Sequence, residues 1–462
     1  MEHIAAECEA MGCRQDLACW LSERPCYDDH PDTLAVGQFV LEARAFIEAW
    51  KRAQQRFPAL TIRLFLSTTT PQRDDVVIAE SPAEVKILRC CITDHERSVN
   101  QPRDLFGNPT LDQAAKAGRW LGSYDVPLTC NGRVETPMFK LPHRSAHRIR
   151  DFVQQMVGRG YSHLCGMMGW HFGIEKVCGL NIGCVFLPPF HISSLADSGT
   201  YRRALAEFSW NPNGRTPAEF AFAWALREGM NEQQAEAFQQ WHDMISPIEW
   251  DIYDSAFPTS YNCPWYVDGP VPHQPGLSTF VTDRLYPTLG VGPFRYFDTV
   301  TSFSEKTRIC DVACKLANEK LSHDPTIAAE AEVAASYVEL LGTIHAVLVL
   351  RAEDDCATED SLREMSARVV AMEEAGARNV AAIRAWRRNV SVVVKGSSAD
   401  TQEVEEASWA QRVYAAISAT QRTVADIVQF ARHSLGAGKA VVLGPDSSGR
   451  FDGPRARHEP KL

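Results

Sequence analysis

The chain has 462 residues and a formal net charge of −11; 45% of its residues are hydrophobic and 23% are charged. These values are typical of a folded globular protein and exclude a disordered chain. The acidic balance, without a basic stripe, argues against nucleic acid as a main partner, because the phosphate backbone is also negative. Fourteen cysteines are too dilute for a disulfide scaffold. At roughly 150 residues per domain, the length predicts about three domains.

The sequence predicts neither a membrane partner nor an export signal. The longest weakly charged run, residues 177–196, is interrupted by glycines, prolines and a histidine, which argues against a membrane span. Glu2, Glu7 and Glu9 stand where a signal peptide would be basic and then apolar. We therefore expect the protein in the cytoplasm.

The first half of the chain alternates apolar, strand-like runs with amphipathic helical segments. The helical segments include 33–57 and 145–157, and the predicted strands are 15–21, 61–67, 85–92, 119–124 and 163–170. This alternation predicts parallel strands covered by helices. A doubly wound sheet could use five strands. The polar, acidic or aromatic residues after the strands are more typical of the active face of a (β/α) barrel. We therefore predict an α/β, TIM-barrel-like fold, incomplete or limited to the second half of the barrel, because a closed barrel needs eight strands.

The second half of the chain is predicted to be mainly helical. Thr216 and Glu219 are spaced as a capping box, and Gly229 closes the helix that follows. Residues 241–300 are rich in Trp, Tyr and Pro without a clear period, which predicts irregular loops. Four long helices at 302–321, 328–351, 358–388 and 403–434 predict an antiparallel bundle. The expected division is a partial barrel (1–205), a helix with aromatic-rich loops packed on it (206–300), a bundle (301–440) and a disordered tail (441–462).

Acidic residues follow three of the predicted strands. Glu23 comes shortly after Trp20, and apolar neighbours raise the pKa of a carboxyl group, as a glycosidase general acid requires. The local pattern by itself favours an ordinary ion pair with Arg24. Asp94, Glu96 and Asp125 are candidates for the second carboxylate that glycoside hydrolysis needs, or belong to solvated loops. Parallel strands would bring these carboxyl groups to one end of the sheet, which favours the catalytic interpretation.

Aromatic residues near the same strand ends are candidate sugar-binding platforms, because a sugar ring presents an apolar face that lies flat on an aromatic ring. For any one of them, ordinary packing at the barrel rim is the alternative. The candidates are Trp20, Trp120, Tyr124 and Trp170, with Trp250 and Tyr253 as a further wall.

No metal or organic cofactor is predicted. Cys8, Cys13, Cys19 and Cys26 have intervals that do not match zinc sites. Cys310 shares a helix face with Cys314, where small core residues are the simpler interpretation. Phosphate-binding glycine loops and a serine-hydrolase elbow are also absent from the sequence.

Several stretches resemble an uncharacterised group of bacterial glycoside-hydrolase-like proteins. They are DLACWLSERPCYDDHPD, FVLEARAFIEAW, GRWLGSYD and EFSWNPNGRTPAEFAFAWALREG, within residues 15–300. The resemblance implies a TIM barrel related to those of β-hexosaminidases and α-glucuronidases, followed by a helical region. It also implies that the first strand here corresponds to about the fourth of such a barrel, which would give Glu23 the acid/base role.

Two functions follow from this sequence. The first is a hydrolase that cleaves a glycosidic bond with paired carboxylates. The second is a non-catalytic carbohydrate-binding or scaffold protein derived from a glycosidase. Either takes carbohydrate as its partner. An incomplete barrel also predicts self-association or a separate N-terminal half-barrel, since an open sheet edge exposes unpaired backbone.

Overall fold

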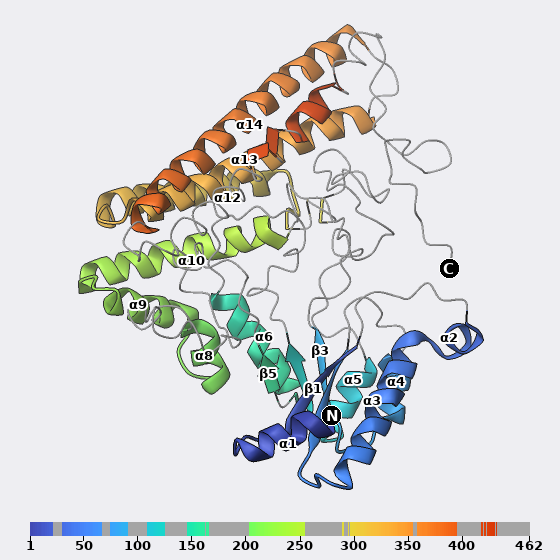
Figure 1. Cartoon of the computed structure of the whole chain (residues 1–462). Helices are drawn as coiled ribbons and strands as arrows, with labels where there is room; N and C mark the ends of the chain where they lie inside the picture. Colours follow the sequence, from blue (N-terminus) through green and yellow to red (C-terminus); the bar gives the residue numbers. More distant parts are fainter. Residues whose placement is uncertain are drawn as a thin grey trace.

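The structure is a computed structural model, and it describes residues 1–21, 30–66, 74–90, 109–124, 146–161, 163–165, 203–254, 289–290, 294, 296–353, 358–394, 417–418, 420–421, 423–429 and 431. Within these residues the fold is α/β, mostly helical, with one five-stranded parallel sheet. The sheet occupies one end of the molecule, and a stack of long helices occupies the other (Figure 1).

The sheet contains all five predicted strands, in the order β1-β2-β3-β4-β5 and with every pair parallel. The strands are β1 (Asp16–Trp20), β2 (Thr61–Leu66), β3 (Lys86–Cys90), β4 (Leu121–Tyr124) and β5 (His163–Cys165). Each connection contains a helix, as parallel pairing requires. The carboxyl ends of the strands point towards the helical stack (Figure 1).

Amphipathic helices connect and cover the strands. They are α3 (Gln38–Gln54), α4 (Asp74–Glu80), α5 (Pro109–Lys116) and α6 (Ala146–Gly158), while α1 (Glu2–Ala10) precedes the sheet. Trp50 of α3 is buried, and its indole Nε1 donates a hydrogen bond to the Leu60 carbonyl at 2.9 Å, just before β2. This bond anchors the apolar face of α3 to the sheet.

The predicted helix over 33–57 is interrupted. The structure has a short α2 (Pro31–Val36) before α3, and Gly37 between them has a φ of 96°. Glycine is the residue that adopts this conformation without steric cost. The apolar spacing predicted the helical stripe correctly but did not indicate the break.

The next helices connect the sheet to the stack. They are α8 (Arg203–Trp210), α9 (Pro217–Arg227) and α10 (Glu232–Asp254). The predicted capping box is confirmed, because the Thr216 hydroxyl accepts from the Glu219 amide and the Glu219 carboxylate accepts from the Thr216 amide. The prediction of irregular loops from 241 is wrong as far as Asp254, since α10 continues through Pro247.

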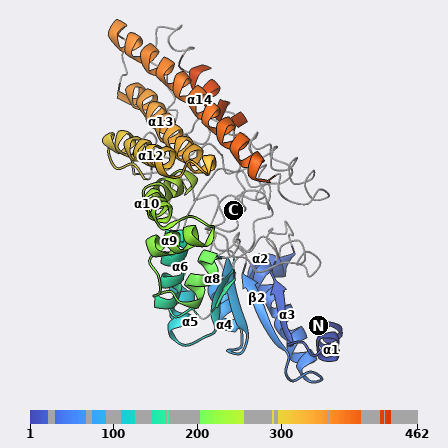
Figure 2. The same ribbon diagram turned by 90° about the vertical axis from the view of Figure 1, so that its left-hand side faces the viewer.

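Three of the four helices predicted for the bundle are α12 (Thr301–Lys320), α13 (Pro325–Glu353) and α14 (Glu359–Val394). Of the fourth, predicted over 403–434, the structure describes only residues between 417 and 431. Figure 2 shows α10, α12, α13 and α14 one above another. The pairing of α13 with α14 runs antiparallel, since Arg378 contacts Glu339 while Asn389 contacts Pro325. The described residues between 417 and 431 are helical and pack on α14, where Val424 lies against Gly376.

A polar network is buried where three of these helical segments meet. The Asn379 amide donates to the Ser336 hydroxyl at 3.0 Å and accepts from the Thr420 hydroxyl at 2.9 Å. Because unpaired polar groups inside a bundle are costly, this network favours one register of α13, α14 and the C-terminal segment.

One helix in the part of the chain that the structure describes is long and apolar enough to cross a membrane. The helix consists of residues Pro325–Leu350 of α13, and 61% of its most apolar 18-residue stretch is buried inside the protein. The core helix of a soluble protein meets the same criterion, so the feature is weak evidence. The expectation that the protein has no membrane partner therefore stays a prediction.

The sheet does not close into a barrel within the described residues. The Ala18 side chain of β1 is exposed, although it lies on the sheet face that a closed barrel would bury. The finer prediction of a TIM barrel, or of half of one, therefore remains a prediction. So do the domain boundaries, and the tail at 441–462 lies outside the described residues.

Candidate functional site

The carboxyl edge of the sheet is the region in which the sequence predicts the site. Glu23 follows the end of β1, Asp94 and Glu96 follow β3, and Asp125 comes directly after β4. These four residues and Trp170 lie outside the described part of the chain, as do the side chains of Tyr124 and Tyr253. What the structure describes is the strands that lead to them.

Trp20 forms an aromatic platform at this edge. It is in register with Phe65 of β2, and the two rings stack with centroids 5.2 Å apart and planes inclined by 12°. The neighbouring residues Cys19 and Leu64 are buried, so the alternation of a strand directs Trp20 and Phe65 to the opposite face. Trp20 is the last residue of β1 and remains 44% exposed, whereas Phe65 is buried beneath it. Part of the Trp20 ring is therefore exposed to solvent at the carboxyl edge of the sheet.

Trp120 lies at the other edge of the sheet. Its carbonyl accepts a hydrogen bond from the Ile87 amide, and it directly precedes β4, so it belongs to the amino end of the strands. Its ring faces two cations, with Arg63 5.5 Å and Lys86 5.6 Å from the ring centroid. The expectation that Trp20 and Trp120 line one cleft is therefore wrong. The run RWLGSY predicted the strand but not its register.

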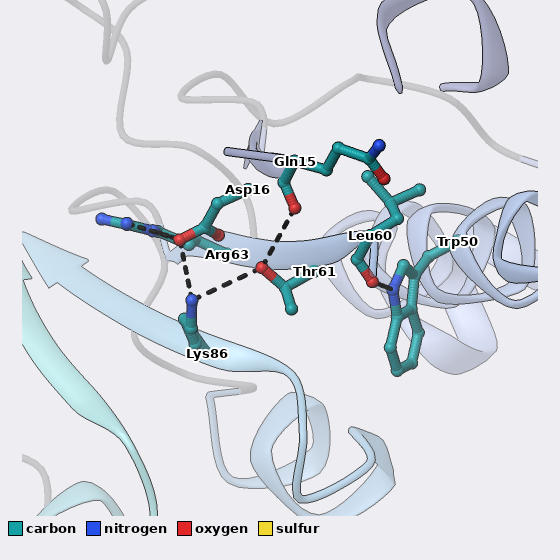
Figure 3. A network of polar contacts seen from close by, with 7 residues as sticks. All are labelled: Gln15, Asp16, Trp50, Leu60, Thr61, Arg63 and Lys86. Atoms are coloured by element: carbon teal, nitrogen blue, oxygen red, sulfur yellow. Dashed lines mark hydrogen bonds and ion pairs between the residues drawn. The ribbon is translucent and has the colours of Figure 1, made fainter. Parts of the chain in front are cut away.

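A charged network occupies this amino edge (Figure 3). The Asp16 carboxylate accepts hydrogen bonds from Arg63 through Nε at 3.0 Å and Nη2 at 2.6 Å, and from Lys86 at 2.7 Å. Lys86 also donates to the Thr61 hydroxyl at 3.4 Å. The Asp16 side chain is only 5% exposed, so two cations and one carboxylate are held together in a largely dry setting.

The electrostatics of Asp16 indicate a structural role. Burial raises the pKa of this carboxyl group, but hydrogen bonds from Arg63, Lys86 and Thr61 lower it by more, to a value far below its ordinary range. A carboxylate with such a pKa stays ionised at physiological pH and is unsuited to donate a proton. The Asp16 network therefore joins β1, β2 and β3 rather than performing acid catalysis.

Trp250 is part of the helical core. It is 6% exposed within α10, and a ring buried to that extent presents no face to a ligand. The next residue, Asp251, pairs with Lys306 of α12 at 2.6 Å, and Lys306 also donates to the Tyr296 carbonyl. The expected wall of the site at Trp250 is therefore a packing contact between helices.

Among the residues that the structure describes, no group of three His, Cys, Asp or Glu side chains is arranged to hold a metal ion. Cys310 is fully buried, as expected of a core residue. The Asp16 network was missed at the sequence level, because its members are 47 and 70 residues apart. The available signal was the presence of Arg63 and Lys86 in the otherwise mainly apolar strands TIRLFL and KILRC.

Comparisons with known proteins give structural likeness only. Neither the protein-family models nor the curated proteins contain a match. Among solved structures, the chain is similar to a GH138 enzyme targeting pectin rhamnogalacturonan II, with 9% identity and a TM-score of 0.48 over 94% of this chain. It spans 57% of that enzyme's chain.

A second similar structure is a mutant O-GlcNAc hydrolase of Thermobaculum terrenum, with 9% identity, a TM-score of 0.34 and coverage of 84% of this chain and 73% of the other. Both structures are glycoside hydrolases.

Proposed function

We propose that this protein is a carbohydrate-active protein of the glycoside-hydrolase type, which cleaves a glycosidic bond with paired carboxylates. The observation that carries the proposal is the exposed Trp20 ring, stacked on Phe65 at the carboxyl edge of a parallel sheet. Aromatic rings of this kind suit the apolar face of a sugar, and active sites of parallel α/β sheets lie at this edge.

The spacing of the strands supports one pairing of carboxylates over another. The ends of β1 and β3 are separated by β2, which corresponds to roughly 9.6 Å at about 4.8 Å per strand. The carboxyl groups of glycosidases are roughly 5–9.5 Å apart, which side chains from these two strand ends can span. The ends of β1 and β4 are roughly 14 Å apart. This favours Asp94 or Glu96, rather than Asp125, as the partner of Glu23.

In the proposed reaction, Glu23 donates a proton to the oxygen of the leaving group. Asp94 or Glu96 attacks the anomeric carbon or activates the water that does so. Trp20 holds the sugar by contact with its apolar face. No step of this mechanism needs a metal or an organic cofactor.

The test is a screen of aryl glycosides and oligosaccharides with the wild type, Glu23→Gln and the matched control Glu48→Gln, an exposed carboxylate on α3. Loss of a general acid lowers kcat by about 10²–10⁴, so Glu23→Gln is expected to lose turnover of unactivated substrates but keep sugar binding. The control should match the wild type. Equal activity of all three would remove Glu23 from the mechanism, and sugar binding without turnover would favour the non-catalytic alternative.

A further inference from the structure

Trp210 is the most exposed large hydrophobic residue in the described part of the chain. It is the last residue of α8, and 91% of its surface is accessible. Phe208, two residues earlier, is fully buried and contacts Phe220 of α9 with ring centroids 5.4 Å apart. Two residues turn a helix by about 200°, so α8 packs through Phe208 and presents Trp210 to solvent.

The segment that carries Trp210 is held on both sides. The Asn211 amide donates to the Glu207 carbonyl at 2.9 Å, and the Gly214 amide donates to the Asn211 carbonyl at 3.0 Å. From α6, the Gln154 amide donates to the Pro212 carbonyl at 2.9 Å. The capping box of α9 begins immediately afterwards. The exposed ring is therefore built on a fixed turn rather than on a loose end.

Two side chains close to Trp210 in the sequence, Glu207 and Arg215, form an ion pair whose charges cancel. Glu207 is three residues before Trp210 and so shares its face of α8. Arg215 donates from Nη1 to both Glu207 oxygens, at 3.0 and 3.1 Å. The Arg215 side chain is still 46% exposed, which leaves donors of its planar guanidinium open to a ligand.

We propose that Trp210, with the Glu207–Arg215 pair, forms a binding surface for a neutral glycan, separate from the site at the sheet edge. A sugar ring offers an apolar face for the indole and peripheral hydroxyls for the carboxylate and guanidinium. Because the Glu207–Arg215 ion pair has no net charge, it favours an uncharged ligand over a polyanion. A protein interface would place apolar neighbours around a central aromatic residue, whereas the partners of this turn are polar.

The surface belongs to a different part of the molecule from Trp20. Trp210 is on α8, which packs against α6 and leads into α9, whereas Trp20 is on β1 at the edge of the sheet (Figure 1). Glycan binding at Trp210 does not depend on hydrolysis at the proposed active site. Its function would be to hold the protein on a polysaccharide chain.

The experiment is native affinity electrophoresis of the full chain in gels that contain xyloglucan, galactomannan, mixed-linkage glucan or, as the anionic comparison, polygalacturonate. The variants are Trp210→Ala, Trp210→Phe and Leu34→Ala. Leu34, an exposed apolar residue of α2, provides the matched control. Circular dichroism verifies that each variant is folded.

We expect at least one neutral polysaccharide to retard the wild type and Leu34→Ala. Trp210→Ala should raise the dissociation constant about tenfold or more, and Trp210→Phe should retain part of the binding because it keeps an aromatic face. Three results would overturn the proposal: no retardation of the wild type, unchanged retardation of Trp210→Ala, or retardation by polygalacturonate alone. None of these results would exclude glycoside turnover that depends on Glu23, so the binding proposal can fail while the proposed function stands.

Discussion

Replacing Asp16 with asparagine removes the carboxylate that Arg63 and Lys86 share at the amino edge of the sheet. The substitution keeps the shape of the side chain and removes its charge. Two cations then remain close together, beside the Trp120 ring, in a setting where the Asp16 side chain was 5% exposed. The perturbation therefore tests whether this network holds β1, β2 and β3 together.

Breaking a buried ion pair by removing one partner costs about 3–5 kcal/mol, because a buried charge is left uncompensated. Arg63 and Lys86 are 26% and 14% exposed, so water partly compensates their charges. We therefore expect Asp16→Asn to lower the free energy of unfolding by about 3 kcal/mol, the lower end of that range. The assay is urea unfolding at pH 7, followed by tryptophan fluorescence and circular dichroism.

The pH dependence of this loss has a defined sign. The folded-state pKa of Asp16 lies below that of an unfolded aspartate, about 3.9, so the carboxylate contributes stability above that pH. The contribution is lost as the pH falls from about 4 towards the folded-state pKa. The difference in unfolding free energy between wild type and Asp16→Asn should be constant from about pH 5 to 8 and should narrow below about pH 4.

Glu80→Gln is the matched control, because it breaks an ion pair of similar geometry on the surface. Glu80 accepts from Arg44 through both oxygens, each at 2.7 Å, but both side chains are exposed. Exposed pairs contribute about 0–1 kcal/mol. If Asp16→Asn and Glu80→Gln have the same small effect, or if the Asp16→Asn difference grows in acid, the reasoning about the network is refuted.

Two further predictions concern the helical stack and the cysteines. Gly376→Leu should lower the free energy of unfolding by about 1–3 kcal/mol, because an added Cβ would lie 2.8 Å from Cγ2 of Val424. The control is Gly158→Ala, which has open space around the added Cβ and should leave the melting temperature nearly unchanged or slightly raised. In the folded protein, iodoacetamide followed by mass spectrometry should label the exposed Cys13 but not Cys310, whose burial raises the pKa of its thiol; labelling of both at equal rates would contradict this.

The sequence predicted the elements of this fold better than their positions relative to one another. Apolar runs bounded by polar residues identified all five strands, and helical spacing identified α12, α13 and α14 of the bundle. The break at Gly37 was missed, because the apolar stripe continues through it. The helix through residue 254 was missed because Pro247 and many aromatic residues obscure its period.

For the candidate site too, the sequence predicted the local elements better than the positions of their side chains relative to one another. The parallel sheet puts the strand ends that precede Glu23 and Asp94 at one edge, and this edge follows from the strand–helix alternation. The misplacement of Trp120 arises from register, which depends on which residue pairs with Ile87 and not on any local pattern. Burial is likewise not visible in the local sequence, since Trp250 is buried and Trp20 is exposed although both lie in aromatic-rich segments.

The order of strands in the sheet is the same as their order in the chain, and this has a consequence for how the protein folds during its synthesis. Each strand that emerges from the ribosome can add to the edge formed by the strand before it, with helical segments in the intervening connections. A sheet with interleaved strand order would instead have to wait for a later segment to fill a gap. Because domains form from the N-terminus onward as translation proceeds, the sheet can grow strand by strand while the helices of the stack are still being translated.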